Sequence, residues 1–135
     1  MTNAEDKIRN EWRIMESFIK RFHDFPKGDL VKSESPDFLL NLNPKKKIGI
    51  ELTLFHAESG FIESINFIIR QKDEKIPIYK QKKLDSCWLV IYIIPDSLPY
   101  RFQIQNKLQK HSFTSLFQKV FVFNMATGKI FQVVG

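Results

Sequence analysis

Two acidic residues of this chain have neighbours that suit them for binding a cation. Asp37 follows Pro36 at the start of one short apolar segment, and Glu51 interrupts a second one. A carboxylate within an apolar strand is costly unless a divalent cation or a lysine compensates its charge. Mg²⁺ in proteins commonly takes one or two carboxylates together with waters and phosphate oxygens. The pair therefore indicates a magnesium site. The alternative is a surface Asp beside a turn and an unrelated Glu facing the edge of a sheet.

Whether the two carboxylates meet depends on how the strands that carry them pair. The sequence Asn43-Pro44-Lys45-Lys46 has a proline at a favoured turn position, so the strands on either side should form a hairpin. A two-residue turn would put Asp37 opposite Leu52, on the wrong face of the sheet. An odd loop, or an equivalent bulge, sets Asp37 opposite Glu51 with Cβ atoms roughly 4.5 to 5.5 Å apart. We predict this second register.

The pattern resembles the PD-(D/E)XK nuclease superfamily, also called the restriction-endonuclease-like fold. Its signature is Pro-Asp at the start of one strand, then an acidic residue, any residue and a lysine in the next. Pro36-Asp37 and Glu51-Leu52-Thr53 match this signature, except that Thr53 stands where lysine is expected. The resemblance implies that Asp37 and Glu51 hold the metal, with the backbone carbonyl of Leu52 as a third ligand. It extends to the order of elements over about residues 5–95.

The resemblance also implies further residues of the site. Some members supply the lysine from the following helix, where Lys72, our first choice, and Lys75, our second, share one helix face with Tyr79. Such a lysine would stabilise negative charge near the scissile phosphate. Members often add a Glu from the first helix, where Glu11 falls on the apolar side and Glu16 at its edge, so Glu11 is the candidate. The alternative for each is a solvated helix surface.

The elements that must position these residues fit one α/β domain, residues 1–135. Apolar residues at helical spacing predict helices over 5–23 and 60–84, the latter kinked or ended at Pro77, and a basic helix over Tyr100–His111. Short apolar segments bounded by turn residues predict strands over 30–32, 38–42, 48–55, 87–94, 120–124 and 129–134. The order αβββαβαββ has a helix between the third and fourth strands, which predicts a crossover and a mixed central sheet flanked by helices.

The distribution of charge favours a polyanionic partner. The chain has 135 residues and a net charge of +6, and no Asp or Glu follows Asp96. Phosphates gain from Lys and Arg through counterion release, so we expect DNA to be held by its backbone along the segment Arg101–Lys119. The alternative is a solvated basic face. Because so small a domain has little room to recognise a sequence of bases, a selective enzyme would need to form a homodimer or recruit a partner protein.

Several other classes of protein are excluded. The single cysteine, Cys87, cannot pair within the chain, so we expect a reducing compartment, the cytoplasm, and a buried inert thiol. No apolar signal segment opens the sequence, and the longest apolar run, Trp88–Ile94, is far shorter than the roughly 20 residues of a membrane-spanning helix. The histidines lack the pairing of a zinc site, and no Gly-rich phosphate loop is present.

The sequence thus predicts a small metal-dependent nuclease that uses Mg²⁺ or Mn²⁺ to hydrolyse DNA. One alternative is a catalytically degenerate protein of the same fold that binds nucleic acid or a protein partner without cleavage, and Thr53 favours it. Another is an interaction protein whose fold was retained for packing alone.

Overall fold

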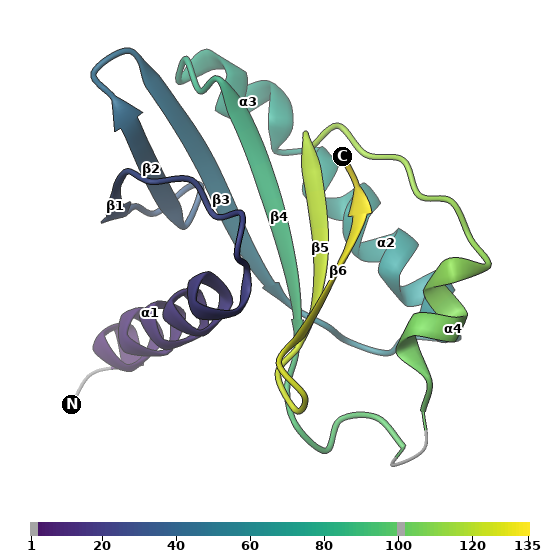
Figure 1. Ribbon diagram of the computed structural model, residues 1–135. Helices are drawn as coiled ribbons and strands as arrows, with labels where there is room; N and C mark the ends of the chain where they lie inside the picture. Colours follow the sequence, from purple (N-terminus) through teal and green to yellow (C-terminus); the bar gives the residue numbers. More distant parts are fainter. Residues whose placement is uncertain (1–2, 100–101) are drawn as a thin grey trace.

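The computed structural model describes residues 3–99 and 102–135, which form a sheet with helices on both of its faces (Figure 1). The elements in chain order are α1 (Asn3–Arg21), β1 (Asp29–Lys32), β2 (Phe38–Asn43), β3 (Lys46–Leu54), α2 (Phe61–Asp73), α3 (Ile76–Gln81), β4 (Ser86–Ile93), α4 (Ile104–Gln109), β5 (Lys119–Asn124) and β6 (Lys129–Val134). Each predicted strand is present within two residues of its expected bounds. In the part of the chain that is described, no helix has the length and apolar character needed to cross a membrane.

The six strands form one mixed sheet in the order β1-β2-β3-β4-β5-β6. The pairs β3–β4 and β4–β5 are parallel, and the remaining neighbours are antiparallel. Parallel neighbours need a crossover connection, which α2 and α3 provide between β3 and β4 and α4 provides between β4 and β5. The predicted α/β class, with a mixed central sheet flanked by helices, is therefore confirmed.

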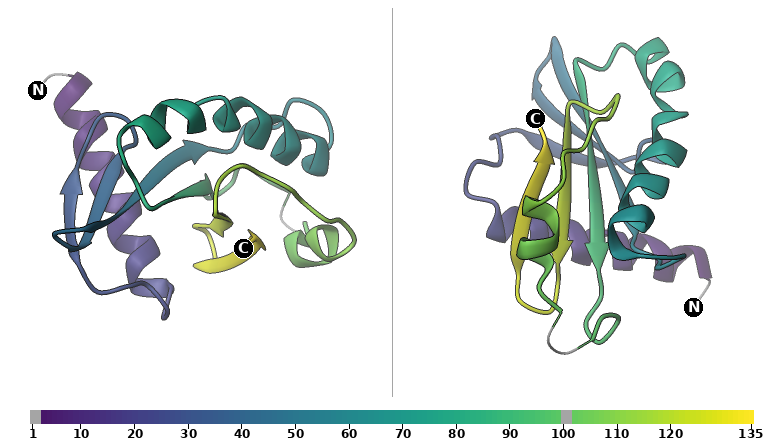
Figure 2. Two further views of the ribbon diagram at one scale, coloured as in Figure 1. Left: turned by 90° about the horizontal axis from the view of Figure 1, so that it is seen from above. Right: turned by 90° about the vertical axis from the view of Figure 1, so that its right-hand side faces the viewer.

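The helices divide between the two faces of the sheet. The view from above in Figure 2 shows α1 on one side of the strands and α2 and α3 on the other. Ile50 and Leu52 of β3 pack into the core beneath α1, whereas Ile65 of α2 and Leu89 of β4 belong to the core on the other face. Since successive side chains of a strand point to opposite faces, Glu51 faces the layer of α2 and α3.

The predicted long helix over 60–84 is two helices, and the break between them lies close to Pro77, where we expected the helix to kink or end. Glu74 and Lys75 form a turn between α2 and α3. The break comes just before Pro77, which lacks the amide hydrogen that a continuous helix would donate to the carbonyl four residues earlier. Pro77 lies instead in the first turn of α3, where that donor is not needed. The element order is therefore αβββααβαββ, which differs from the predicted order by one helix.

The predicted basic helix over Tyr100–His111 is shorter than expected. Helix α4 covers only Ile104–Gln109, and His111 lies in the loop that follows it. Tyr100 and Arg101 lie outside the described residues, as does the Arg101 end of the predicted DNA-binding segment.

Candidate active site

Strands β2 and β3 pair in the predicted register, in which the residue numbers of paired positions fit an odd loop or bulge. Phe38 pairs with Ile50, and a bulge in β2 near the turn absorbs the extra residue. One step beyond the Phe38 pair, this register sets Asp37 opposite Glu51. The alternative register, with Asp37 opposite Leu52, is not formed.

The carboxylate of Asp37 binds the backbone of β3 at the point where β2 begins. The Leu52 N–H donates to Asp37 Oδ2 at 2.8 Å. The Asp37 side chain thus takes the place of the backbone carbonyl that would be the next acceptor between β2 and β3. Burial raises the pKa of Asp37 from 3.8 to about 7, with further contributions from the negative charge of Glu51 and from the nearby carboxyl of Glu11. The hydrogen bond from Leu52 opposes this rise in pKa but does not cancel it. Acidic groups are therefore crowded near the start of β2.

Glu51 is the buried member of the site, with 3% of its surface exposed. Its Oε2 accepts hydrogen bonds from Lys72 Nζ at 3.0 Å and Lys75 Nζ at 2.9 Å, and its Oε1 accepts one from the Tyr79 hydroxyl at 3.0 Å. Burial alone would raise the pKa of Glu51, but the hydrogen bonds and positive charges of Lys75 and Lys72 outweigh it and lower the pKa. Glu51 is thus a buried, ionised carboxylate held by three donors.

The three donors come from both sides of the break between α2 and α3. Lys72 lies in the last turn of α2, Lys75 in the turn before α3, and Tyr79 within α3. Burial lowers the pKa of Lys75, but its bond to Glu51 and the attraction between the two charges outweigh burial and raise it, so Lys75 remains a cation. The predicted helical spacing therefore brings all three residues to Glu51, although the helix that was expected to carry them is broken.

Tyr79 connects Glu51 to the segment that carries Asp37. It is fully buried, and its hydroxyl accepts a hydrogen bond from Ser35 Oγ at 3.4 Å while donating to Glu51. Burial raises the pKa of Tyr79 well above its ordinary value, so the phenol keeps its proton and remains a donor. We assigned no role to Tyr79 from the sequence. Its spacing from Lys72 and Lys75 was the available signal.

Glu11 reaches the same region from α1. Its Oε1 lies 3.4 Å from Lys32 Nζ, and Lys32 also donates to the backbone carbonyl of Asp37 at 2.9 Å. Glu16, the other acidic candidate in this helix, is exposed. Lys32 was not predicted as a site residue, because its role depends on the pairing of β1 with β2, which places it beside Phe38.

An open groove gives solvent access to this end of the site. It has a volume of about 440 Å³ and lies between the first half of α1 and the connection from β1 to β2. Glu11, Lys32 and Asp37 line it, together with Lys7 and Glu34. Asp37 therefore borders this groove, whereas the buried Glu51 does not line it.

Gly49 allows the segment before Asp37 to pack closely against β3. A Cβ atom at Gly49 would lie 2.8 Å from Pro36 Cγ and 2.7 Å from Leu84 Cδ1. Real Cβ atoms do not approach other atoms so closely, so a side chain here would push Pro36 or Leu84 away. The absence of a side chain at position 49 thus helps to set the position of Asp37.

Carboxylates such as those of Asp37 and Glu51 are the type of ligand that a hard divalent cation takes. Among residues 3–99 and 102–135, no group of three or more His, Cys, Asp and Glu side chains is arranged to hold a metal ion. Mg²⁺ does not require such a group, since one or two carboxylates with waters and substrate oxygens suffice. Burial, followed by the nearby carboxyls of Glu51 and Glu11, raises the pKa of Asp37, and a bound cation would favour its ionised form. The backbone of Leu52 lies at the same place through its bond to Asp37.

Two residues near the site do not contribute to this chemistry. Thr53, in the position where the superfamily signature has lysine, is partly buried and carries no charge. Cys87 is a free, buried thiol, and burial raises its pKa to about 11. A thiol that keeps its proton is a poor nucleophile and a poor metal ligand, which agrees with the inert cysteine predicted from the sequence.

The site defines the molecule as an α/β protein with an acidic pair and two lysines at one end of a mixed sheet. Comparison with protein-family models, with curated proteins and with solved structures found no match. The function therefore has to be inferred from the chemistry of the site.

Proposed function

We propose that the protein is a metal-dependent nuclease of the PD-(D/E)XK type, which hydrolyses phosphodiester bonds of DNA with Mg²⁺ or Mn²⁺. The observation that carries this proposal is the meeting of Glu51 with two lysine amines, 3.0 and 2.9 Å away, beside a second carboxylate, Asp37. Carboxylates that bind a metal and lysines that stabilise phosphate charge are the groups that phosphodiester hydrolysis requires.

In this proposal Asp37 and Glu51 hold the metal ion, with the backbone carbonyl of Leu52 as a further ligand. The ion, when bound, supplies a Lewis acid for the phosphate and lowers the pKa of a coordinated water. Glu11 and Lys32 orient Asp37 from the solvent side, through the Lys32 contacts to both residues. Asp37 has to be ionised when the metal binds, because a protonated carboxyl group is a poor ligand for a cation.

Lys72 and Lys75 take the role of the lysine that the superfamily signature has at the position of Thr53. Each amine is a compact charge on a flexible side chain, so it can move from Glu51 toward a scissile phosphate. Lys72 is the more buried of the two, with 22% of its side chain exposed against 42% for Lys75. We therefore keep Lys72 as the main stabiliser of transition-state charge and assign Lys75 to holding Glu51.

The substrate is held through its backbone by basic residues near the C-terminus. Lys107 and Lys110 are exposed on and just after α4. Lys119 contributes less, because its ammonium group lies over the ring of Trp88, 5.2 Å from its centroid. Backbone contacts position a substrate without selecting its sequence, so a selective enzyme would act as a homodimer or with a partner protein, in the cytoplasm.

A cleavage assay tests the proposal. The purified protein is incubated with plasmid, duplex, single-stranded DNA and RNA in Mg²⁺, in Mn²⁺ and in EDTA. We expect cleavage with either metal, none in EDTA, and none from Asp37→Ala or Glu51→Ala. A rise in melting temperature with added metal, lost in the same two variants, measures binding of the ion independently of cleavage. Arg70→Ala, on the exposed surface of α2, is the matched control.

One observation favours a second candidate, a nuclease-like protein that binds without cutting. The charge of Glu51 is already compensated by Lys72 and Lys75, and Tyr79 donates to its other oxygen, so the fold tolerates this buried carboxylate without a metal ion. This candidate predicts no cleavage and no thermal shift with metal, but binding of DNA with a steep dependence on salt concentration.

A further inference from the structure

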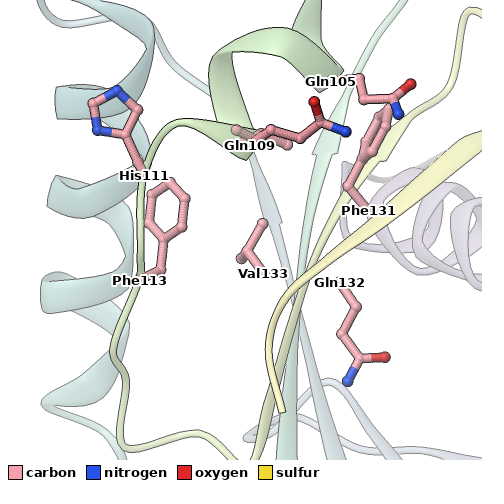
Figure 3. A pocket seen from close by; sticks show the side chains of 8 residues that line it. Gln105, Gln109, His111, Phe113, Phe131, Gln132 and Val133 are labelled. Carbon is pink, nitrogen blue, oxygen red and sulfur yellow. The ribbon is translucent and has the colours of Figure 1, made fainter.

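A second pocket lies at the β6 end of the sheet, between α4, the loop after it and β6 (Figure 3). Its volume is about 290 Å³, which is at the small end of the range for ligand pockets. This volume suits one flat ring system and excludes a duplex. The loop that forms one wall is fixed at its far end, where Asp73 Oδ1 accepts hydrogen bonds from Ser115 Oγ at 2.6 Å and Leu116 N–H at 3.1 Å.

The walls of the pocket combine aromatic rings with side-chain amides. Figure 3 shows Phe113 and Phe131 on opposite sides with Val133 between them. Gln105 and Gln109 reach the pocket from successive turns of α4. Both are exposed, and neither amide has a hydrogen-bond partner among residues 3–99 and 102–135. A ligand here would meet flat apolar surfaces and the two amides of Gln105 and Gln109, which can both donate and accept hydrogen bonds. The imidazole of His111 and the amide of Gln132, which donates to the Gly135 carbonyl, also line the pocket.

The charges around the pocket narrow the class of ligand. No Asp, Glu, Lys or Arg lines it, whereas the exposed Lys107 and Lys110 flank it on α4 and in the next residue along the chain. The chain from residue 102 to its end contains no acidic residue. The best match is an uncharged planar group attached to a negatively charged backbone, which is the chemistry of an unpaired nucleobase. Bases stack on aromatic rings, and glutamine amides pair with their edges.

The pocket lies on the same side of the sheet as Glu51. Phe113, Phe131 and Val133 pack against the core that contains Tyr79, beneath α2 and α3. Strand β6 is three strands from β3, which corresponds to roughly 14 Å across the sheet. We infer that the pocket holds an unpaired base of a single-stranded nucleic acid. This inference rests on the proposed nuclease function and names its substrate as single-stranded.

Binding in EDTA tests the pocket separately from cleavage. A short, end-labelled single-stranded DNA is titrated with the full-length protein at fixed salt concentration, and Kd is read from fluorescence anisotropy. We expect the double variant Gln105→Ala/Gln109→Ala to raise Kd about fivefold or more, and Phe113→Leu to raise it by a comparable factor. Asn106→Ala changes an exposed amide of α4 outside the pocket and should leave Kd unchanged. An abasic oligonucleotide should bind the wild type and all the variants equally.

The outcomes separate this inference from the proposed function. If the wild type does not cleave but the glutamine variant still weakens binding of the single strand, only the nuclease proposal fails. If the wild type cleaves and the glutamine variant binds as tightly as the wild type, the inference about the pocket is overturned. Tighter binding of duplex than of single strand also overturns it. The inference is also overturned if the side-chain amide resonances of Gln105 and Gln109 change when the protein alone is diluted. Such a change would mean that the pocket contacts a second copy of the chain.

Discussion

The hydroxyl of Tyr79 donates to Glu51 Oε1 at 3.0 Å, and both side chains are buried. The other oxygen, Oε2, is bound by Lys72 and Lys75. Tyr79 therefore fixes the orientation of the carboxylate, so that one oxygen always faces the two amines. Because Ser35 donates to the same hydroxyl, this bond also connects the helix layer to the segment that leads into Asp37.

Tyr79→Phe should lower the free energy of unfolding by about 1 to 3 kcal/mol, because a buried carboxylate oxygen loses its partner. Urea denaturation at neutral pH measures the change. Tyr92→Phe is the matched control, since the Tyr92 side chain is partly buried in the neighbouring strand β4 and its hydroxyl has no hydrogen bond to any residue of the described ranges. Equal losses in the two variants would show that the Tyr79 bond contributes nothing of its own.

Lys72 and Lys75 should substitute for each other in stabilising Glu51. Lys72→Met or Lys75→Met leaves one amine on the carboxylate, so each should cost about 1 kcal/mol or less. The double variant leaves a buried charge without a cation, and it should cost about 1 to 3 kcal/mol more than the sum of the single losses. A double-mutant cycle in urea measures this excess.

Lys80→Met in the exposed part of α3 serves as the control for removing a lysine from the same surface. Strictly additive losses in the cycle would mean that the two amines act on Glu51 independently. Activity gives a second readout, because Lys72→Met should abolish cleavage while Lys75→Met retains part of it.

The local part of the site could be predicted from the sequence. The turn with Pro44 allowed two registers, and the one that brings Asp37 and Glu51 to the same face, which we predicted, is the one that β2 and β3 adopt. The need to compensate a carboxylate inside an apolar strand also pointed to lysines. These features depend on neighbours in one hairpin and on helical spacing, which sequence patterns record directly.

The remaining features depend on contacts between distant segments. We expected the helix to break at Pro77, and it breaks two residues earlier. At this break Lys75 donates a hydrogen bond to Glu51, a contact between distant segments. Lys32 could not be assigned, because its contacts with Glu11 and Asp37 join three separate elements. No periodicity in the sequence specifies which side chains meet across such a junction.

Gly49→Ala should destabilise the protein and impair the site together. The new methyl group would lie 2.7 and 2.8 Å from Leu84 and Pro36, and relieving such overlap in a packed region costs about 1 to 3 kcal/mol. Thermal unfolding and the cleavage assay should both respond, because Pro36 carries Asp37 with it. Gly60→Ala is the control: its new Cβ would meet only the end of the Glu63 side chain, which can move away. A Gly49→Ala protein of wild-type stability would contradict this account of its packing.

The pKa of Asp37 should make the metal-free protein less stable as the pH rises toward neutrality. Its pKa rises from 3.8 to about 7 on folding, so between these values the folded state keeps a proton that the unfolded state has released. Stability contributed by this proton is complete below about pH 4 and is lost as the pH passes through about 7. Glu51 acts in the opposite direction, since its pKa is lowered from 4.5 and its contribution is lost only at more acidic pH.

The free energy of unfolding of the wild type, measured relative to that of Asp37→Asn, should therefore fall by about 1 to 3 kcal/mol between about pH 5 and pH 8, after allowance for solvent screening. Asparagine keeps an acceptor for the Leu52 N–H but cannot titrate, so the difference isolates the carboxyl group. Added Mg²⁺ should reverse the fall at about pH 8 and have little effect at about pH 5, because only the ionised Asp37 binds a cation. A parallel pH dependence of the two proteins would rule out a buried, crowded Asp37 and would remove the main physical reason for a cation at this edge of the sheet.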